Sequence, residues 1–75
     1  KKTISSKKYL ALLNWLKAAR KEQCLSMRDL AVKLDQPHSF IGKIETAERR
    51  LDVYEFVQYC KALGLDPKEG IDRLF

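Results

Sequence analysis

The chain has 75 residues, 45% of them hydrophobic and 33% charged, and its formal net charge is +5. This length allows one small domain with a modest core, and the composition is typical of a globular protein rather than a disordered one. No stretch approaches the roughly 20 apolar residues that cross a bilayer, and no apolar segment of a signal peptide follows the basic start. We therefore expect a single domain over residues 1–75, located in the cytoplasm and without a membrane partner.

The positive charge is concentrated in the first part of the chain. Residues 1–50 carry 12 Lys and Arg against 5 Asp and Glu, whereas residues 51–75 carry 3 against 5. Such an asymmetric charge favours a polyanionic partner, although solubility alone would also explain it. Cys24 and Cys60 form no Cys-x-x-Cys pair and suit a reducing compartment, with one disulfide left open. With only His38 beside the two cysteines, no metal site is predicted. The sequence also gives no sign of a cofactor, and none is predicted.

A first helix is predicted to begin at Ser5 or Ser6 and to reach about Gln23. Its apolar residues recur at spacings of three and four and form one stripe: Tyr9, Leu12, Leu13, Leu16 and Ala19. The lysines near the start form either a loose basic arm or an ordinary solvated terminus: Lys1, Lys2, Lys7 and Lys8. Disorder is expected over residues 1–6.

A second helix is predicted to begin at Ser26. The stretch SMRD has the form of a capping box, in which Ser26 caps the helix and Asp29 reaches back. The helix should end after Leu34, since Pro37 disfavours helical backbone in the residue before it. Its inner face is expected to consist of Leu30, Ala31 and Leu34.

A third helix is predicted to begin with Pro37 in its first position and Gln36 as its cap. Its apolar side carries Phe40, Ile41 and Ile44, and it should fade near Thr46–Ala47. Only about three residues, Asp35–Pro37, separate it from the second helix.

Two further helices complete the prediction. Asp52 and Glu55 form another capping box, and the helix that follows should end at Gly64. Its expected inner stripe, in which Cys60 is a core thiol, is Val53, Phe56, Val57, Cys60 and Leu63. The last helix opens at DPKE with Asp66 as cap, Pro67 in the first position and Glu69 in the third, and its apolar residues are Ile71, Leu74 and Phe75.

The second and third helices have the arrangement of a helix-turn-helix. The connection between them is short, and the small side chain of Ala31 allows them to cross closely. Leu30, Leu34, Ile41 and Ile44 supply apolar contacts between them. In such a motif the second helix projects its first residues from the surface, where they can enter a DNA groove.

Leu25 to Pro67 reads LSMRDLAVKLDQPHSFIGKIETAERRLDVYEFVQYCKALGLDP. This stretch resembles the phage-repressor and Cro-like helix-turn-helix family, also called the XRE family, and with the first helix the likeness covers about residues 9–67. The matching residues are Leu25, Ser26, Leu30, Ala31, Leu34, Ser39, Ile41, Ile44, Glu45, Arg49, Arg50, Ala62, Leu63 and Gly64. The resemblance implies an all-α, five-helix lambda-repressor-like domain that binds double-stranded DNA, in a bacterial or phage cytoplasm at the nucleoid.

The chain departs from the family pattern at four places. Met27 replaces a glutamine that often contacts a DNA phosphate, and a thioether cannot make that contact. Asp35 replaces the glycine of the turn, and Cys24 and Ala47 also replace glycines. These substitutions concern local turn geometry rather than the fold.

The resemblance also implies which residues contact DNA. His38, Ser39, Gly42 and Lys43 would face base edges in the major groove, with Gly42 allowing close approach. Phosphate contacts would come from the start of the second helix, where Ser26, Met27 and Arg28 lie, and from Thr46, Arg49 and Arg50 after the third. An ordinary exposed surface is the alternative for His38. Arg20 and Glu45 correspond to a structural ion pair between the first and third helices.

We therefore predict a repressor-like transcriptional regulator that binds DNA as a homodimer, with the last helix as a dimer patch unless its apolar residues close the core. An antitoxin of the same fold would also bind DNA, and a protein-interaction module would have kept the fold and lost DNA. An enzyme is not predicted, because the sequence contains no catalytic pair, phosphate loop or metal spacing.

Overall fold

The structure, a computed structural model, describes residues 6–75 and is all-helical over that range. The five helices are α1 (Lys7–Glu22), α2 (Met27–Leu34), α3 (His38–Glu45), α4 (Val53–Leu63) and α5 (Pro67–Asp72). The expected five-helix class is confirmed. The arm predicted over residues 1–6, including Lys1 and Lys2, and the alternative cap Ser5 lie outside the described residues, apart from Ser6 itself. Lys7 and Lys8 belong to the first turn of α1 and so are not part of a loose arm.

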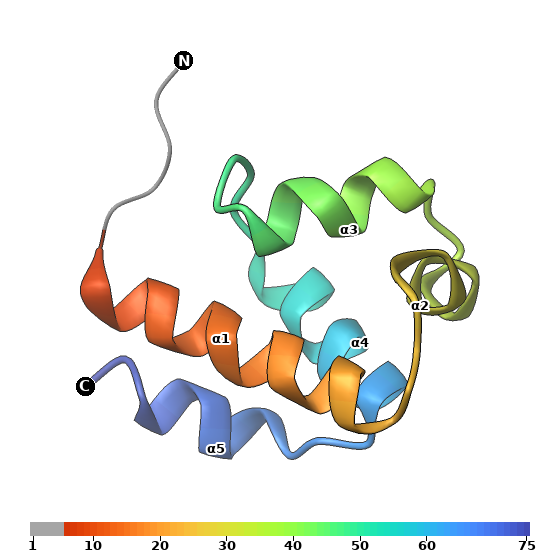
Figure 1. The fold of residues 1–75 in the computed structure, drawn as a ribbon. Helices are drawn as coiled ribbons and strands as arrows, with labels where there is room; N and C mark the ends of the chain where they lie inside the picture. The colour runs from red at the N-terminus through yellow and green to blue at the C-terminus, as the bar shows by residue number, and fades with distance from the viewer. Residues whose placement is uncertain (1–5) are drawn as a thin grey trace.

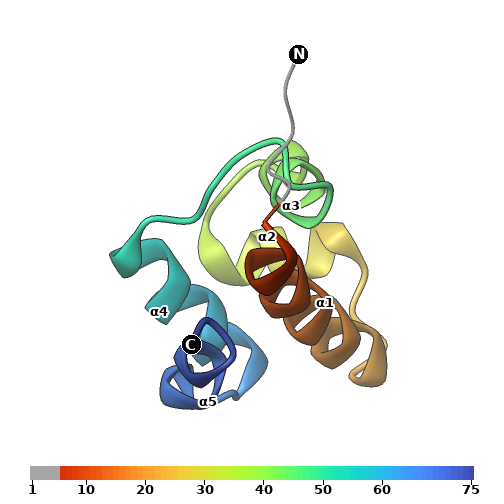
Figure 2. The same cartoon turned by 90° about the vertical axis from the view of Figure 1, so that its left-hand side faces the viewer.

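The helices surround one core to which α1 to α4 contribute. In Figures 1 and 2, α3 and α5 lie at opposite ends of the molecule, with α1 and α4 between them. The core residues are Leu12, Leu13, Leu16, Ala19, Leu30, Ala31, Ile41, Ile44, Ala47, Phe56, Tyr59, Cys60 and Leu63. Within residues 6–75, no helix has the length and apolar character needed to cross a membrane.

The helix starts follow from their capping residues. Ser6 accepts a hydrogen bond from the Tyr9 amide, and Asp66 accepts one from the Lys68 amide. The capping boxes of α2 and α4 are both complete. The third helix differs from the prediction, because its cap is Pro37 rather than Gln36 and makes no side-chain hydrogen bond. Pro37 has an extended backbone with ψ 150°, which leaves His38 as the first helical residue.

Four of the five described helices end in the same way, with a residue of left-handed backbone. These residues are Cys24 (φ 57°), Asp35 (φ 55°), Ala47 (φ 64°) and Gly64 (φ 71°). In each case the next amide donates to the carbonyl five residues earlier: Leu25 to Arg20, Gln36 to Ala31, Glu48 to Lys43 and Leu65 to Cys60. This is the hydrogen bond of a Schellman motif. Three of these turns are therefore formed on non-glycine residues, at Cys24, Asp35 and Ala47, at a cost in backbone strain.

The inner face of α4 differs from the predicted stripe. Val53 is 83% exposed, whereas Tyr59 is 1% exposed and belongs to the core. Val53 is the first residue of the helix and does not reach the core. The regular spacing of apolar residues therefore predicted its burial wrongly. Cys60 is fully buried as expected, and burial raises the pKa of its thiol to about 11.

The short helix α5 is held against α1 by close packing. A Cβ atom on Gly70 would lie 2.6 Å from Cζ3 of Trp15 and 2.8 Å from Cζ of Phe56. Arg73 also stacks over the Trp15 ring at 4.7 Å from its centroid. Ile71 and Phe75 remain exposed and do not close the core, while Leu74 packs against it.

Candidate nucleic-acid interface

The outer face of α3 carries the predicted base-reading residues. His38, Ser39 and Lys43 are exposed and Gly42 is half-buried. On the opposite side of the same helix, Ile41 and the following core isoleucine are fully buried. Residues three and four positions apart share a side of a helix, so the structure brings these four residues together. In Figure 1, α3 lies along one edge of the molecule and has α1 and α4 on its inner side.

Gly42 has no packing reason to be a glycine. A Cβ atom at this position would meet no heavy atom within 4 Å. A glycine inside a helix costs about 0.5–1 kcal/mol relative to alanine. The fold therefore gains no packing contact in return for this loss of helix stability. Because Gly42 has no side chain, the surface of α3 has a shallow depression at this position.

A bidentate ion pair fixes α3 relative to α1. Nε of Arg20 lies 2.6 Å from Oε2 of Glu45, and Nη2 lies 3.1 Å from Oε1. Nη1 of Arg20 also donates to the carbonyl of Leu25 at 2.7 Å, which ties in the loop before α2. The two side chains are only 9% and 3% exposed. The hydrogen bond that Arg20 donates to Glu45 raises the pKa of the Arg20 guanidinium, which is charged at all ordinary pH values.

The start of α2 is largely occupied by its own capping box. Ser26 accepts from the Asp29 amide at 3.0 Å, and its own amide donates to Oδ2 of Asp29 at 2.9 Å. The backbone hydrogen bond from Ser26 lowers the pKa of Asp29. Met27 is half-buried and packs against the core, whereas Arg28 is exposed. Of the three residues predicted to contact phosphate here, Arg28 is the one with an accessible cation.

The segment after α3 holds the other predicted phosphate contacts. The Thr46 hydroxyl has one proton to donate, and two acceptors inside the protein already compete for it. The carbonyl of Gly42 and a carboxylate oxygen of Glu48 both lie 2.9 Å from the hydroxyl oxygen. Arg49 is bound to Glu55 through two hydrogen bonds of 2.9 Å each. Arg50 is exposed, and among the described residues its side chain has no ion-pair partner.

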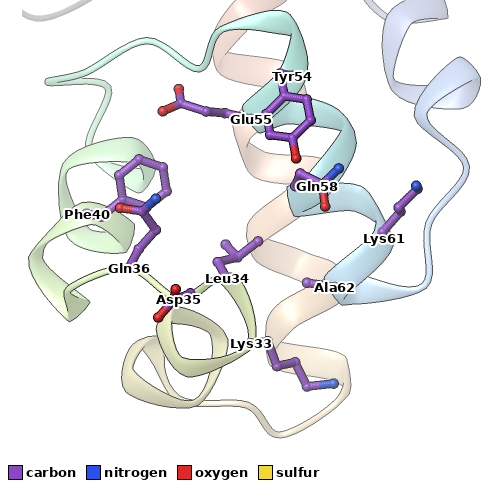
Figure 3. Close-up of a pocket in the computed structure, with 10 residues that line it drawn as sticks. All are labelled: Lys33, Leu34, Asp35, Gln36, Phe40, Tyr54, Glu55, Gln58, Lys61 and Ala62. Carbon is purple, nitrogen blue, oxygen red and sulfur yellow. The ribbon is translucent and has the colours of Figure 1, made fainter.

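A groove of about 420 Å³ opens beside the start of α3. Figure 3 shows it between α3, the end of α2 and the outer side of α4, with Phe40 and Gln36 on one wall and Tyr54 and Gln58 on the other. Its remaining lining residues are Lys33, Leu34, Asp35, Glu55, Lys61 and Ala62. Within residues 6–75, no three His, Cys, Asp or Glu side chains gather closely enough to hold a metal ion.

Sequence reasoning missed the contact of Arg49 with Phe40 and Glu55. The centre of the Arg49 guanidinium lies 4.9 Å from the centroid of the Phe40 ring. No regular spacing connects these residues, because Phe40 and Glu55 lie on different helices and Arg49 lies in the loop between them. The capping box already explained Glu55 and the apolar stripe already explained Phe40, so neither residue pointed to Arg49.

The comparisons with known proteins agree with this geometry. A sequence profile of the helix-turn-helix family matches residues 16–69. An XRE-family like protein from Pseudomonas syringae pv. tomato str. DC3000 is 43% identical, covers 89% of this chain and 82% of its own, and superposes with a TM-score of 0.82. The chain belongs to the XRE family of helix-turn-helix proteins. Among curated proteins, none matches the chain by sequence.

Two further solved structures share the XRE-type fold. The restriction-modification controller protein C.AhdI from Aeromonas hydrophila is 25% identical, with a TM-score of 0.67 and coverage of 91% of this chain and 92% of its own. The clp gene regulator ClgR from C. glutamicum is 17% identical, with a TM-score of 0.79 and coverage of 93% and 91%. This XRE-family chain is accordingly a helix-turn-helix domain of the DNA-binding regulator class, as its sequence predicts.

Proposed function

We propose that this XRE-family protein is a sequence-specific transcriptional repressor that binds double-stranded DNA as a homodimer and reads the major groove with α3. The observation that carries the proposal is the two-sided character of α3. Ile41 and Ile44 on its inner side are completely buried, and its outer side presents donors and acceptors to solvent. A helix fixed in this way can place its outer side chains against base edges without losing its own packing.

Each reading residue has a defined chemistry. Lys43 donates to O6 or N7 of guanine, His38 donates to guanine or phosphate, and Ser39 serves several base edges. Gly42 lets the backbone approach the bases. The phosphate contacts come from exposed cations around this face, of which Arg28 and Arg50 are the clearest. Ser26 and Met27 at the start of α2 and Thr46 after α3 are included in the proposed phosphate-facing segments.

The homodimer is assigned to the face that α4 and α5 form together. A groove of about 440 Å³ there is lined by Val53, Phe56, Val57, Pro67, Lys68, Ile71 and Asp72. Ile71 is 40% exposed and Val53 is 83% exposed, so apolar surface faces solvent on both helices. Lys68 and Asp72 lie at the same groove, so a two-fold arrangement can pair Lys68 of one copy with Asp72 of the other. A second copy of the chain therefore fits this face in both apolar character and charge.

Sedimentation tests the dimer. The parent protein should sediment as a dimer at micromolar concentration, and Ile71→Lys should shift it to the monomer because a charge replaces the apolar contact. Val32→Lys is the matched control, because Val32 is 80% exposed on α2 and lies outside the groove. A parent protein that remains monomeric, or an Ile71→Lys variant that remains dimeric, would contradict this interface.

Selection of bound duplexes from a random DNA pool tests the reading function. An enriched two-fold sequence is expected, with half-sites about one helical turn apart. Lys43→Ala should then cost about 1–3 kcal/mol on the selected site and relax preference at one or two base positions. Equal weakening on every sequence would show that α3 is not the reader. A pool without any enriched sequence would instead favour a protein-interaction module.

The salt dependence of DNA affinity tests the proposed phosphate contacts. If about six phosphates are neutralised, the logarithm of affinity should fall with the logarithm of salt concentration at a slope of about −5. Arg50→Ala should weaken binding to all sequences alike and make that slope shallower by about one unit, since phosphates present the same charge everywhere. A flat salt response would rule out DNA binding as the main function.

A further inference from the structure

The start of α3 is the least supported helix start in the described part of the chain. The other four described helices have a side chain that caps them, whereas Pro37 makes no such hydrogen bond. The Phe40 amide donates to the Pro37 carbonyl at 3.0 Å within the turn. His38 and Ser39, two of the proposed reading residues, lie in this uncapped first turn. Phe40 belongs to the same turn, so a contact that holds its side chain also restrains His38 and Ser39.

Arg49 holds Phe40 from outside the helix. Its guanidinium lies over the Phe40 ring at 4.9 Å from the centroid, a cation–π arrangement. The same guanidinium donates through Nη1 and Nη2 to the two carboxylate oxygens of Glu55, each at 2.9 Å. A planar guanidinium can make both contacts at once, because its edge donates while its face stacks.

Glu55 gives this contact a rigid base. Its Oε1 also accepts from the Asp52 amide at 3.0 Å, and its own amide donates to Oδ1 of Asp52 at 2.7 Å. The carboxylate is therefore part of the capping box of α4 and cannot move far from the start of that helix. In Figure 3 the Glu55 carboxylate points toward the Phe40 side of the groove, from α4 toward α3.

We propose that Arg49 is a positioning residue that clamps the reading helix α3 to α4 through Phe40 and Glu55, and that it is not a phosphate contact. Both terminal nitrogens of its guanidinium already donate to Glu55, and the side chain is 43% exposed beside a carboxylate that is 21% exposed. Nη1 also lies 3.3 Å from the carbonyl of Arg50, so three of the five guanidinium N–H groups are in use. A phosphate at this position would therefore meet a guanidinium whose charge Glu55 already offsets. Arg50, the next residue, has no such partner among the described residues and remains the phosphate contact. This inference rests on the proposed DNA-reading function.

The variant Glu55→Gln tests the clamp without removing a positive charge. Glutamine keeps a carbonyl for the Asp52 amide and is accepted in a capping box, so α4 should stay folded. If Arg49 is a positioning residue, both Glu55→Gln and Arg49→Gln should lower the affinity ratio between the selected site and random duplex by roughly tenfold. The slope of affinity against salt should remain unchanged in both variants. Arg50→Gln, the matched control, should make that slope shallower by about one unit and keep the ratio.

Two results would overturn the clamp. Arg49→Gln could make the slope shallower by about one unit and leave the affinity ratio intact, as expected of a phosphate contact. Glu55→Gln could raise affinity for all duplexes and steepen the slope, which would mean that Glu55 restrains a cation that DNA would otherwise use.

Hydrogen exchange separates this inference from the proposed function, because it needs no DNA. The Phe40 amide should exchange roughly tenfold faster in Glu55→Gln than in the parent, while core amides of α1 should not change. Unchanged protection of Phe40 would refute the clamp even if the protein binds its site. Conversely, faster exchange in a protein that binds no duplex would support the clamp and refute the DNA-reading function.

Discussion

Arg20 and Glu45 form the one ion pair in residues 6–75 whose two side chains are both almost completely buried. Their closest atoms, Nε and Oε2, are 2.6 Å apart, and the side chains are 9% and 3% exposed. Two charges in such a site are stable only as a well-oriented pair, because either charge alone would keep the cost of its lost hydration. The orientation of α3 on α1 is therefore linked to the stability of the domain.

Removing one member of this pair should destabilise the fold. Arg20→Ala is expected to lower the free energy of unfolding by about 3–5 kcal/mol, because Glu45 would remain buried without a partner. The double variant with Glu45→Gln should recover part of that loss. Urea denaturation of the single and double variants measures the coupling, and Lys21→Ala, at an exposed neighbouring position, is the control. Losses that simply add would show that the two residues are not coupled.

Adding one methyl group at Gly70 should separate α5 from α1. The new Cβ would lie 2.6 Å from Trp15 and 2.8 Å from Phe56, so at least one ring must move. Gly70→Ala is expected to cost about 1–3 kcal/mol of unfolding free energy, the usual cost of overpacking. Thermal denaturation checks the value, and a change in Trp15 fluorescence should accompany it. An unchanged midpoint would mean that α5 adjusts freely.

The same substitution at Gly42 should have the opposite effect on stability. Its new Cβ meets no heavy atom within 4 Å, and alanine is the better residue inside a helix. Gly42→Ala should therefore raise the unfolding free energy by about 0.5–1 kcal/mol. If α3 approaches the bases closely, the variant should also bind its selected site more weakly. Improved stability with unchanged DNA affinity would remove Gly42 from the proposed interface.

The left-handed turn at Cys24 offers another gain in stability. Cys24 has φ 57° and is exposed, so its side chain is strained by the backbone and contributes no core packing. Cys24→Gly should raise the unfolding free energy by about 0.5–1 kcal/mol, because glycine adopts this conformation without the clash of a Cβ. Gly64→Ala, at φ 71°, should lower it for the same reason. A decrease for Cys24→Gly would indicate an additional role for that side chain.

The Arg49–Glu55 contact should make stability sensitive to acid. The hydrogen bonds from Arg49, and then from the Asp52 amide, hold the pKa of Glu55 below its ordinary value of 4.5. Such a group stabilises the fold fully above its ordinary pKa, and the contribution is lost as the pH falls through the lower, folded pKa. The difference in unfolding free energy between the parent and Glu55→Gln should therefore shrink as the pH falls from about 7 to about 3. A difference that stays constant over this range would mean that the carboxylate is not paired.

Local patterns in the sequence predict most of the fold. The boxes at Ser26–Asp29 and Asp52–Glu55, the proline at the start of α5 and the glycine at the end of α4 are all found where the sequence places them. Capping and turn formation depend on residues within about four positions of each other, and such neighbours can be identified without a structure. The buried Cys60 and the exposed outer side of α3 follow from helical spacing in the same way.

The sequence by itself determined the five helices, their family and the side of α3 that faces solvent, because these depend on short-range spacing and on a pattern shared with relatives. Only the tertiary structure decided that Arg49 is bound to Glu55 while Arg50 is not, and that Val53 is exposed while Tyr59 is buried. Two adjacent arginines are equivalent in a sequence. They become different when packing brings a carboxylate and an aromatic ring, 6 and 9 residues away along the chain, within reach of only one of them.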